Sequence, residues 1–213
     1  ALRDFCRCAP DRFIGLAHFN PRDSAEGLDR ELDRALALGF RGIKLLNAYQ
    51  DNLPGDDPAL MRIYRFAARH QLFILNHYWT PEVLGRIARE FPTVPFIAGH
   101  WYLHEVLRLP NVYCNLWGLL RLGDIEFGVR EFGADKFLLG SDAFLNPLTV
   151  GLGLVMQADL PDEDKRKILG LNQARILHSA RALPAAWIPT VTALDTQPSG
   201  GPPHAEPQNL LHP

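Results

Sequence analysis

The sequence predicts an α/β protein built on a parallel sheet. Six short apolar runs alternate with amphipathic stretches along residues 12–180. The runs are apolar throughout, which is typical of parallel strands that are covered on both faces. Six strand–helix units fit either an open doubly wound sheet or most of a closed barrel. The runs lie at 13–17, 42–46, 72–75, 94–98, 112–114 and 137–139.

The stretches between the runs carry helix signals. Ser24 is a good N-cap for a helix over 24–38, where apolar residues recur at helical spacing. Pro58 and Pro81 each suit the first turn of a further helix. The clearest pattern predicts a last helix over 163–180. No GxGxxG or GxxxxGK[ST] motif follows any run, so the common nucleotide-binding loops are absent from the sequence.

Composition narrows the class of partners. The 213 residues carry a net charge of −2 without a basic run, which argues against a nucleic-acid partner and against an anionic membrane surface. The longest uncharged apolar stretch, 150–156, is too short to span a bilayer. Three cysteines, an odd number, do not form a disulfide framework and fit the reducing cytoplasm. We therefore expect a cytoplasmic protein with a small-molecule substrate.

The domain organisation follows from where proline accumulates. Seven of the 17 prolines fall within 184–213, where no helix or strand period is present. We predict one folded domain over 1–182 and a disordered proline-rich tail over 183–213. Because the chain starts at Ala1 in what reads as the middle of a helix, we also expect a segment upstream of it.

Polar side chains follow the apolar runs at the points where the strands end. His18 follows the first run, Lys44 lies within the second, and His77, His100 and Asp142 end the third, fourth and sixth. Because the carboxyl ends of parallel strands converge on one face, we expect these side chains to lie close together. Three histidines and an aspartate from four strands predict a metal site or an acid/base site.

Each of these residues also has a structural alternative. His18 can be a hydrogen-bonded loop residue, and Lys44 can extend to solvent or pair with a carboxylate. For His77, His100 and Asp142 together the functional interpretation is favoured. Otherwise three titratable residues would have to occur independently by chance at equivalent strand ends.

Three tryptophans follow the third, fourth and fifth runs by a few residues. They are Trp79, Trp101 and Trp117. Large flat side chains at the mouth of a pocket can hold a planar substrate and exclude water. The alternative is that they pack loops onto helices, and the sequence does not distinguish the two.

Seven segments carry a family resemblance. They are RFIGLAHFNP, LGFRGIKL, FILNH, PFIAGHW, NVYCNL, DKFLLGSDAF and KRKILGLNQARIL. Together they cover residues 1 to about 180. In this order they resemble the amidohydrolase-related family of metal-dependent barrel hydrolases, in the branch that includes aminocarboxymuconate-semialdehyde decarboxylase. The Gly-Ser-Asp ending and the Asn-Gln-Ala-Arg helix are the most specific segments.

The resemblance implies a (β/α)8 TIM barrel of the metal-dependent hydrolase type, here lacking strands 1 and 2. It implies that His77 and Asp142 are metal ligands and that His100 is a second ligand or the acid/base group, while Asp142 can also accept a proton. Lys44 lies in the segment where some wider relatives bridge metals. The ion implied is divalent, zinc first and manganese second. The family's His-x-His of strand one does not occur in this sequence.

The function expected on this basis is metal-dependent hydrolysis of a small cyclic or carboxylate-bearing substrate by metal-activated water. Non-oxidative decarboxylation is the alternative within the family. A catalytically inactive barrel remnant that binds a ligand or a partner subunit is the alternative of another class. A phosphate-handling barrel would need a glycine-rich turn, for which 151–153 is the one candidate. Without strands 1 and 2 the outer strands would be unpaired, so we also expect homo-oligomers or poor solubility.

Overall fold

The computed structural model describes residues 1–188 apart from 51, 101–103, 118–120 and 144. Its centre is a six-stranded sheet in the order β1-β2-β3-β4-β5-β6, and every neighbouring pair is parallel. Each predicted run overlaps one strand. The strands are β1 (Leu16–His18), β2 (Gly42–Leu45), β3 (Phe73–Asn76), β4 (Phe96–Ala98), β5 (Val112–Leu116) and β6 (Phe137–Leu139).

The strand order follows the chain order, as it does in a barrel. A doubly wound sheet would instead reverse direction partway. The fold is therefore the α/β barrel type with six of its eight strands, which confirms the predicted fold class. Within the described residues β1 and β6 each pair on one side only, so the sheet has two open edges. The association that we expect through these edges stays a prediction.

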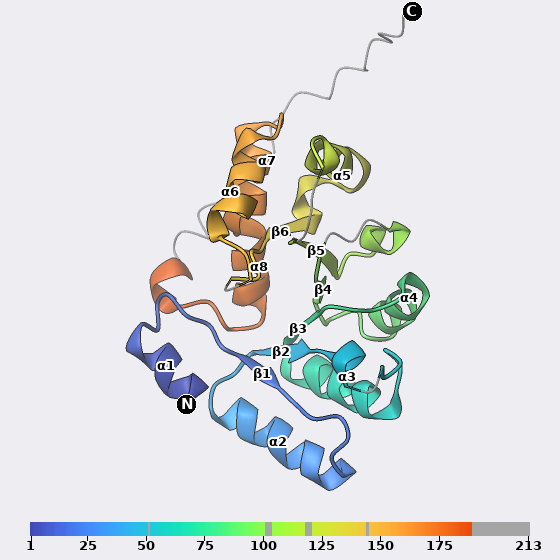
Figure 1. Cartoon of the computed structure of the whole chain (residues 1–213). Helices are drawn as coiled ribbons and strands as arrows, with labels where there is room; N and C mark the ends of the chain where they lie inside the picture. The colour runs from blue at the N-terminus through green and yellow to red at the C-terminus, as the bar shows by residue number, and fades with distance from the viewer. Residues whose placement is uncertain (51, 101–103, 118–120, 144, 189–213) are drawn as a thin grey trace, which may run out of the picture.

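Helices lie on both sides of the row of strands, with α3, α4 and α5 on one side and α8 on the other (Figure 1). The predicted starts are correct: the Ser24 hydroxyl accepts a hydrogen bond from the Gly27 N–H, and Pro58 and Pro81 open their helices. The helices are α1 (Leu2–Cys8), α2 (Ala25–Ala37), α3 (Pro58–His70), α4 (Pro81–Glu90), α5 (Asp124–Phe132), α6 (Leu148–Gln157), α7 (Asp162–Arg166) and α8 (Asn172–Ser179).

The last helix differs from the continuous helix that the sequence predicts over 163–180. A π-helical turn, Lys167–Leu171, separates α7 from α8. Ile168 packs among the core residues on the helix-covered side of the sheet, whereas Ile176 packs in a second cluster on the other side. Ile168 lies within the π turn and Ile176 lies in α8, so the helix passes from one apolar cluster to the other at and after this turn.

Side chains along the strands alternate between two apolar clusters. One cluster joins strand residues such as Ile43, Ile74 and Phe96 to the helices. The other lies on the opposite face, where Ile176 and Ala180 pack against the strands. Its strand members are Leu16, Phe73, Leu75, Ile97, Tyr113 and Leu138. The second face is thus apolar toward the amino ends of the strands, and polar residues take over toward the carboxyl ends.

Beyond the barrel, the start of the predicted tail is ordered. Residues Ala185–Trp187 form a 3-10 turn, and the Trp187 indole N–H donates to the Asp11 carbonyl oxygen at 3.1 Å. Most of the tail, 189–213, lies outside the described residues, so its disorder stays a prediction. Cys6, Cys8 and Cys114 form no disulfide within the described residues.

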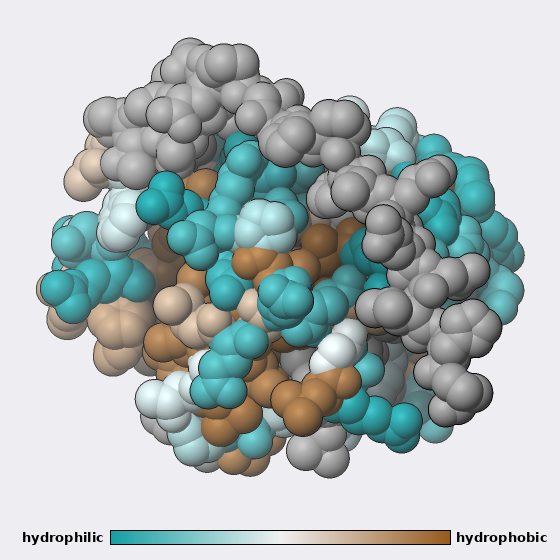
Figure 2. Space-filling model, turned by 90° about the horizontal axis from the view of Figure 1, so that it is seen from above, coloured by the Kyte–Doolittle hydropathy of each residue, from teal (hydrophilic) through white to brown (hydrophobic). Residues whose placement is uncertain are grey.

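In the part of the chain that is described, no helix is both long enough and apolar enough to cross a bilayer. The apolar stretch 150–156 lies within the ten-residue helix α6. Seen from above, apolar side chains gather in the middle and lower middle of this face, with polar side chains around them (Figure 2).

Candidate functional site

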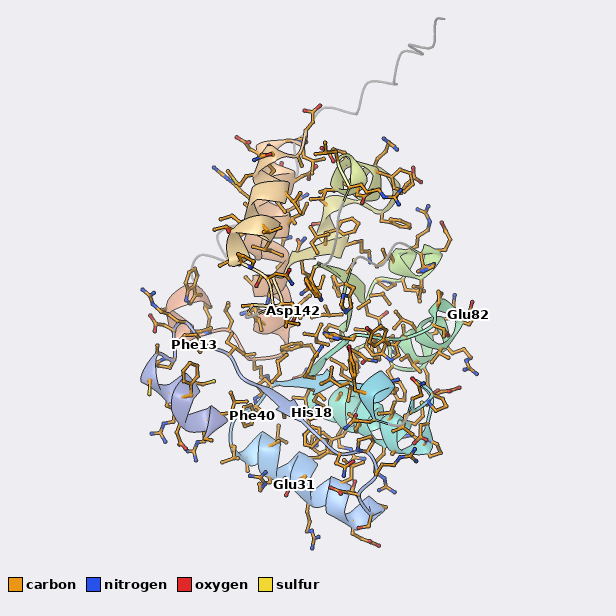
Figure 3. All side chains as sticks on the ribbon, in the orientation of Figure 1. Phe13, His18, Glu31, Phe40, Glu82 and Asp142 are labelled. Carbon is orange, nitrogen blue, oxygen red and sulfur yellow. The ribbon has the colours of Figure 1, made fainter. Side chains whose placement is uncertain are left out.

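The carboxyl ends of β2, β3, β4 and β6 bring four of the predicted side chains together. The rings of His77 and His100 are 4.7 Å apart between centroids, in an edge-on arrangement. Lys44 and Asp142 lie close enough to change the protonation of both imidazoles. His18 and Asp142 come from the two outer strands of the sheet, as Figure 3 shows.

The end of β3 is held by a buried amide network. The Asn76 side-chain amide donates to the Asn47 amide oxygen and to the Tyr78 carbonyl oxygen, both at 2.8 Å. The Gly99 N–H donates to the Asn76 carbonyl oxygen at 2.7 Å. A Cβ on Gly99 would lie 3.0 Å from Cδ2 of the His77 ring, so glycine leaves room for this imidazole. The hydrogen bonds of Asn47 and Asn76 therefore fix the end of β3, directly before His77.

The sequence analysis did not assign Asn47 and Asn76 to the site. The available signal is the polar Asn76 at the end of an otherwise apolar strand, in a position with no exposed area. Its partner Asn47 lies in the 3-10 turn Asn47–Tyr49 and could not have been paired with it from the sequence.

Two of the candidate residues have unusual backbone angles. His100 has φ = 62° and Asp142 has φ = 50°, in the left-handed region that non-glycine residues rarely adopt. Each such residue costs about 1 kcal/mol or somewhat more relative to a right-handed conformation. Residues with this strain cluster at functional sites, where the rest of the fold maintains them. The observation supports a functional interpretation of both positions.

Both imidazoles are neutral at pH 7. Burial, followed by the charge of Lys44, lowers the pKa of His77 from its ordinary 6.5 to about 4. Burial also lowers the pKa of His100, with Asp142 opposing the shift. Nδ1 of His77 and Nε2 of His100 are buried without a hydrogen-bond partner among the described residues. Buried polar atoms normally have partners, so these two nitrogens indicate a ligand that the protein chain does not supply.

Lys44 supplies a cation beside the histidines. Burial lowers the pKa of Lys44 to about 8, while the carboxylate of Asp142 opposes the shift. The side chain therefore remains mostly protonated at pH 7 and can attract an anionic substrate. His18 is exposed, and its Nδ1 lies 2.9 Å from the Lys44 carbonyl oxygen. Of the two alternatives for His18, this contact supports the hydrogen-bonded one.

The donor chemistry suits a divalent ion, although a complete cage is not formed by the described residues. Neutral imidazole nitrogens and a carboxylate are the ligands that zinc and related ions prefer. Among the residues that the structure describes, no group of three or more His, Cys, Asp or Glu side chains is arranged to hold a metal. Among the described residues the rings of His77 and His100 are in contact, and the charge of Asp142 acts on both imidazoles. The assignment of all three as ligands stays a prediction.

The predicted tryptophans differ in whether they pack in the core or face the candidate site. Trp79 is 6% exposed and its indole N–H donates to the Tyr64 hydroxyl at 3.1 Å, so it packs in the core as the structural alternative proposes. Trp117 faces His100 with ring centroids 5.2 Å apart, and its buried Nε1 has no partner among the described residues. Trp101 lies outside the described residues. Tyr78 also faces the His100 ring, at 5.8 Å.

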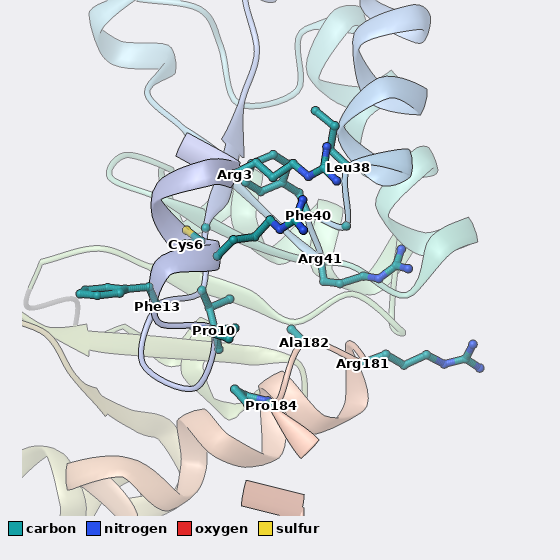
Figure 4. Close-up of a pocket in the computed structure, with 14 residues that line it drawn as sticks. Arg3, Cys6, Pro10, Phe13, Leu38, Phe40, Arg41, Arg181, Ala182 and Pro184 are labelled. Carbon is teal, nitrogen blue, oxygen red and sulfur yellow. The ribbon is translucent and has the colours of Figure 1, made fainter. Parts of the chain in front are cut away.

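A cavity of about 360 Å³ lies at the opposite end of the sheet, between α1, the segment before β2 and the segment after α8 (Figure 4). It includes Ile14 and Gly15, directly before β1, and Arg41, directly before β2. Its lining contains arginines but no histidine and no carboxylate. This cavity therefore lacks the groups that acid/base or metal chemistry needs.

The turn required by the phosphate alternative is not formed. Gly151 and Gly153 lie inside α6 and not in a loop that opens a helix. The glycines allow close packing of this helix instead: a Cβ on Gly151 would lie 3.0 Å from the Gly140 carbonyl oxygen. The expectation for 151–153 as a phosphate turn is wrong for this reason.

Comparison with protein families gives one match that covers most of the chain. A family model described as Amidohydrolase (Amidohydro_2) matches residues 1–178. Comparison with curated protein sequences finds no match.

Solved structures with the same fold include three that match with probability 1.00. An uncharacterised TIM-barrel protein of Bordetella bronchiseptica is 20% identical, with a TM-score of 0.74 over 84% of this chain and 72% of its own. The 5-carboxyvanillate decarboxylase of Sphingomonas paucimobilis is 19% identical, with a TM-score of 0.69 over 83% and 70%. A dihydroxybenzoic acid decarboxylase of Polaromonas, with bound manganese and the inhibitor 2-nitroresorcinol, is 18% identical, with a TM-score of 0.70 over 87% and 74%.

Proposed function

The chain belongs to the amidohydrolase family, and we propose from this membership that it is a divalent-metal decarboxylase of small arene carboxylic acids. The observation that carries the proposal is the pair of neutral imidazoles whose buried nitrogens lack a partner among the described residues, beside a cation and a carboxylate. The donor set fits a divalent ion, and when bound such an ion supplies Lewis-acid polarisation of a substrate oxygen.

Each residue of the site has a role in this proposal. His77 would hold the ion through Nδ1, and His100 would be either a second ligand through Nε2 or the acid/base group. Lys44 binds the substrate carboxylate through its ammonium group, because a protonated amine compensates the charge of a partly desolvated anion. Asp142 or His100 carries a proton to the ring carbon that bears the carboxylate.

The reaction balances without a redox cofactor. A proton adds to the ring carbon, the bond from that carbon to the carboxylate breaks, and its electron pair returns to the ring as carbon dioxide leaves. An arene carboxylate and one proton therefore give an arene and carbon dioxide. Two of the similar structures are decarboxylases of hydroxylated benzoic acids, and one of them contains manganese, which supports this substrate class and places manganese beside zinc as a candidate ion.

Hydrolysis is the second candidate, favoured by the description of the family model. In that reaction Asp142 or His100 would take a proton from an attacking water, and the substrate would be an amide or ester of a carboxylate-bearing ring. The two candidates use the same residues and differ in the bond that breaks. Products therefore distinguish them.

The test is metal content and turnover measured on the same preparations. The protein is incubated with Mn²⁺ or Zn²⁺ and a panel of hydroxybenzoates, with arene formation followed by chromatography and carbon dioxide by a coupled assay. Matched aryl amides and esters report hydrolysis. We expect His77→Ala to lose bound metal and to lower turnover at least about hundredfold, because loss of a residue that merely hydrogen-bonds to a metal ligand already costs about 10- to 100-fold.

His70→Ala is the matched control, because His70 lies at the end of α3 against the Phe66 ring. It should keep both metal and turnover. If His77→Ala keeps them as well, the proposed site is wrong. If the protein binds metal and benzoates but turns over nothing in either panel, the inactive-remnant alternative replaces the proposal.

A further inference from the structure

A small cavity lies between Trp117 and the first turns of α6. Its volume is about 130 Å³, enough for a substituent of a few non-hydrogen atoms. Trp117 joins it to the proposed site, because the same indole lines the cavity and faces the His100 ring. We call it the α6 slot. Its lining residues are Leu116, Trp117, Gly140, Ser141, Asn146, Pro147, Val150, Gly151 and Leu154.

The slot exists because α6 lies very close to the ends of β5 and β6. A Cβ on Gly151 would lie 3.0 Å from the Gly140 carbonyl oxygen and 3.4 Å from Cδ1 of Leu139. Glycine at this position therefore lets the helix backbone approach the strand ends. The space left beside the contact is lined by Trp117, Asn146 and Val150, among other residues.

The slot offers hydrogen-bonding groups but no charge. The Trp117 indole N–H is a donor only, and it is buried without an acceptor among the described residues. Ser141 and Asn146 add a hydroxyl and an amide to the lining. The lining residues include no Lys, Arg, Asp or Glu. A carboxylate placed there would be desolvated without compensation, whereas an uncharged oxygen would satisfy the indole.

We propose that the α6 slot is a specificity pocket that receives an uncharged oxygen substituent on the substrate ring, with Trp117 as its hydrogen-bond donor. This inference rests on the proposed function, since it takes the substrate to be a small arene carboxylate. The carboxylate then lies toward Lys44 and the imidazole pair, and the second substituent lies in the slot. Trp117 is a specificity-determining residue in this arrangement.

The test compares ligands that differ by one acceptor atom. Binding of 2-, 3- and 4-methoxybenzoate is measured by calorimetry in the presence of Mn²⁺, each against the ethylbenzoate of the same position. Methoxy and ethyl groups have the same number of non-hydrogen atoms, but only methoxy accepts a hydrogen bond. For at least one position we expect the methoxy compound to bind about fivefold more tightly, the effect of one net hydrogen bond.

Variants assign this preference to the slot. Trp117→Phe keeps an aromatic ring against His100 but has no donor, so it should bind methoxy and ethyl compounds within twofold of each other (about 0.4 kcal/mol). Trp187→Phe, which changes an indole on the far side of the fold, should keep the fivefold preference. Asn146→Leu provides a second variant in the slot and should weaken the preference if Trp117→Phe does not fold.

The outcomes separate the two proposals. If benzoate binds but no position shows a preference, or if Trp117→Phe keeps the preference, the slot proposal is overturned and the proposed function stands. If neither benzoate nor any substituted benzoate binds to the metal-loaded protein, the proposed substrate class fails, and the slot proposal fails with it.

Discussion

The two ends of the sheet use buried polar side chains in opposite ways. At the amino end, the Asn111 amide nitrogen lies 3.0–3.1 Å from the carbonyl oxygens of Ala88 in α4 and of Phe91 and Val94 in the α4–β4 connection. Asn172 bonds two carbonyl oxygens and Lys136 two more. At the carboxyl end, His77 and His100 keep buried nitrogens without a partner among the described residues.

This difference indicates that buried polar side chains at the amino end stabilise the fold, whereas those at the carboxyl end can bind a ligand. A side chain whose donors are all used within the fold has no capacity left for a ligand, and its loss leaves buried carbonyl groups unpaired. A side chain that the fold leaves unsatisfied costs stability unless a ligand completes it. This division agrees with the general rule that barrels place chemistry at the carboxyl ends of their strands.

The largest expected change in stability tests the role of the satisfied amides at the amino ends of the strands. Asn111→Ala removes the amide that joins the end of α4 to the start of β4 and β5, and we expect the free energy of unfolding to fall by about 2 kcal/mol. Metal content should not change. Urea unfolding measures the first quantity and elemental analysis the second.

Asn115→Ala is the matched control at the carboxyl end, because this half-buried amide packs over Gly140 near the site. Its effect on stability should stay below about 0.5 kcal/mol. Equal losses from the two substitutions would contradict the proposed division between the two ends.

The sequence predicts the strands and the residues at their ends better than it predicts how side chains pack. Continuous apolar runs predict all six strands, because fully covered parallel strands have a strong local pattern. The same runs place His77, His100 and Asp142 at strand ends. The packing of tryptophans does not follow from these runs, since Trp79 reaches Tyr64 from 15 positions away in the chain. Only the three-dimensional fold shows that Trp79 has a partner and that Trp117 lacks one among the described residues.

Other features could not be predicted because their causes are not periodic. Helix α6 is apolar on most of its surface, so no amphipathic pattern marks it. The π turn at Lys167–Leu171 comes from a change in the packing surface partway along one helix. The Asn47–Asn76 contact joins positions 29 residues apart and depends on how β3 ends.

A smaller effect concerns the strained backbone at the carboxyl end. Because His100 has φ = 62°, His100→Gly should be more stable than His100→Ala by about 1 kcal/mol. At His77, which is not in the left-handed region, the order should reverse, with glycine less stable than alanine. Chemical denaturation of the four metal-free variants measures both differences. Alanine equal to or better than glycine at His100 would show that no strain is stored there.

The smallest effect concerns protonation of the carboxyl end. Since the pKa of His77 falls from 6.5 in the unfolded chain to about 4 in the folded protein, the folded state binds fewer protons between these values. Stability is therefore complete above about pH 6.5 and decreases as the pH falls toward 4. Solvent screens a side chain that is only partly buried, so the change is modest. Urea unfolding of the chelator-treated protein should show a shallower decrease for His77→Asn than for His70→Asn. An identical pH dependence of the unfolding free energy in both variants would mean that burial does not oppose protonation of His77. The polar groups at the two ends of the sheet would then differ less than their hydrogen bonds indicate.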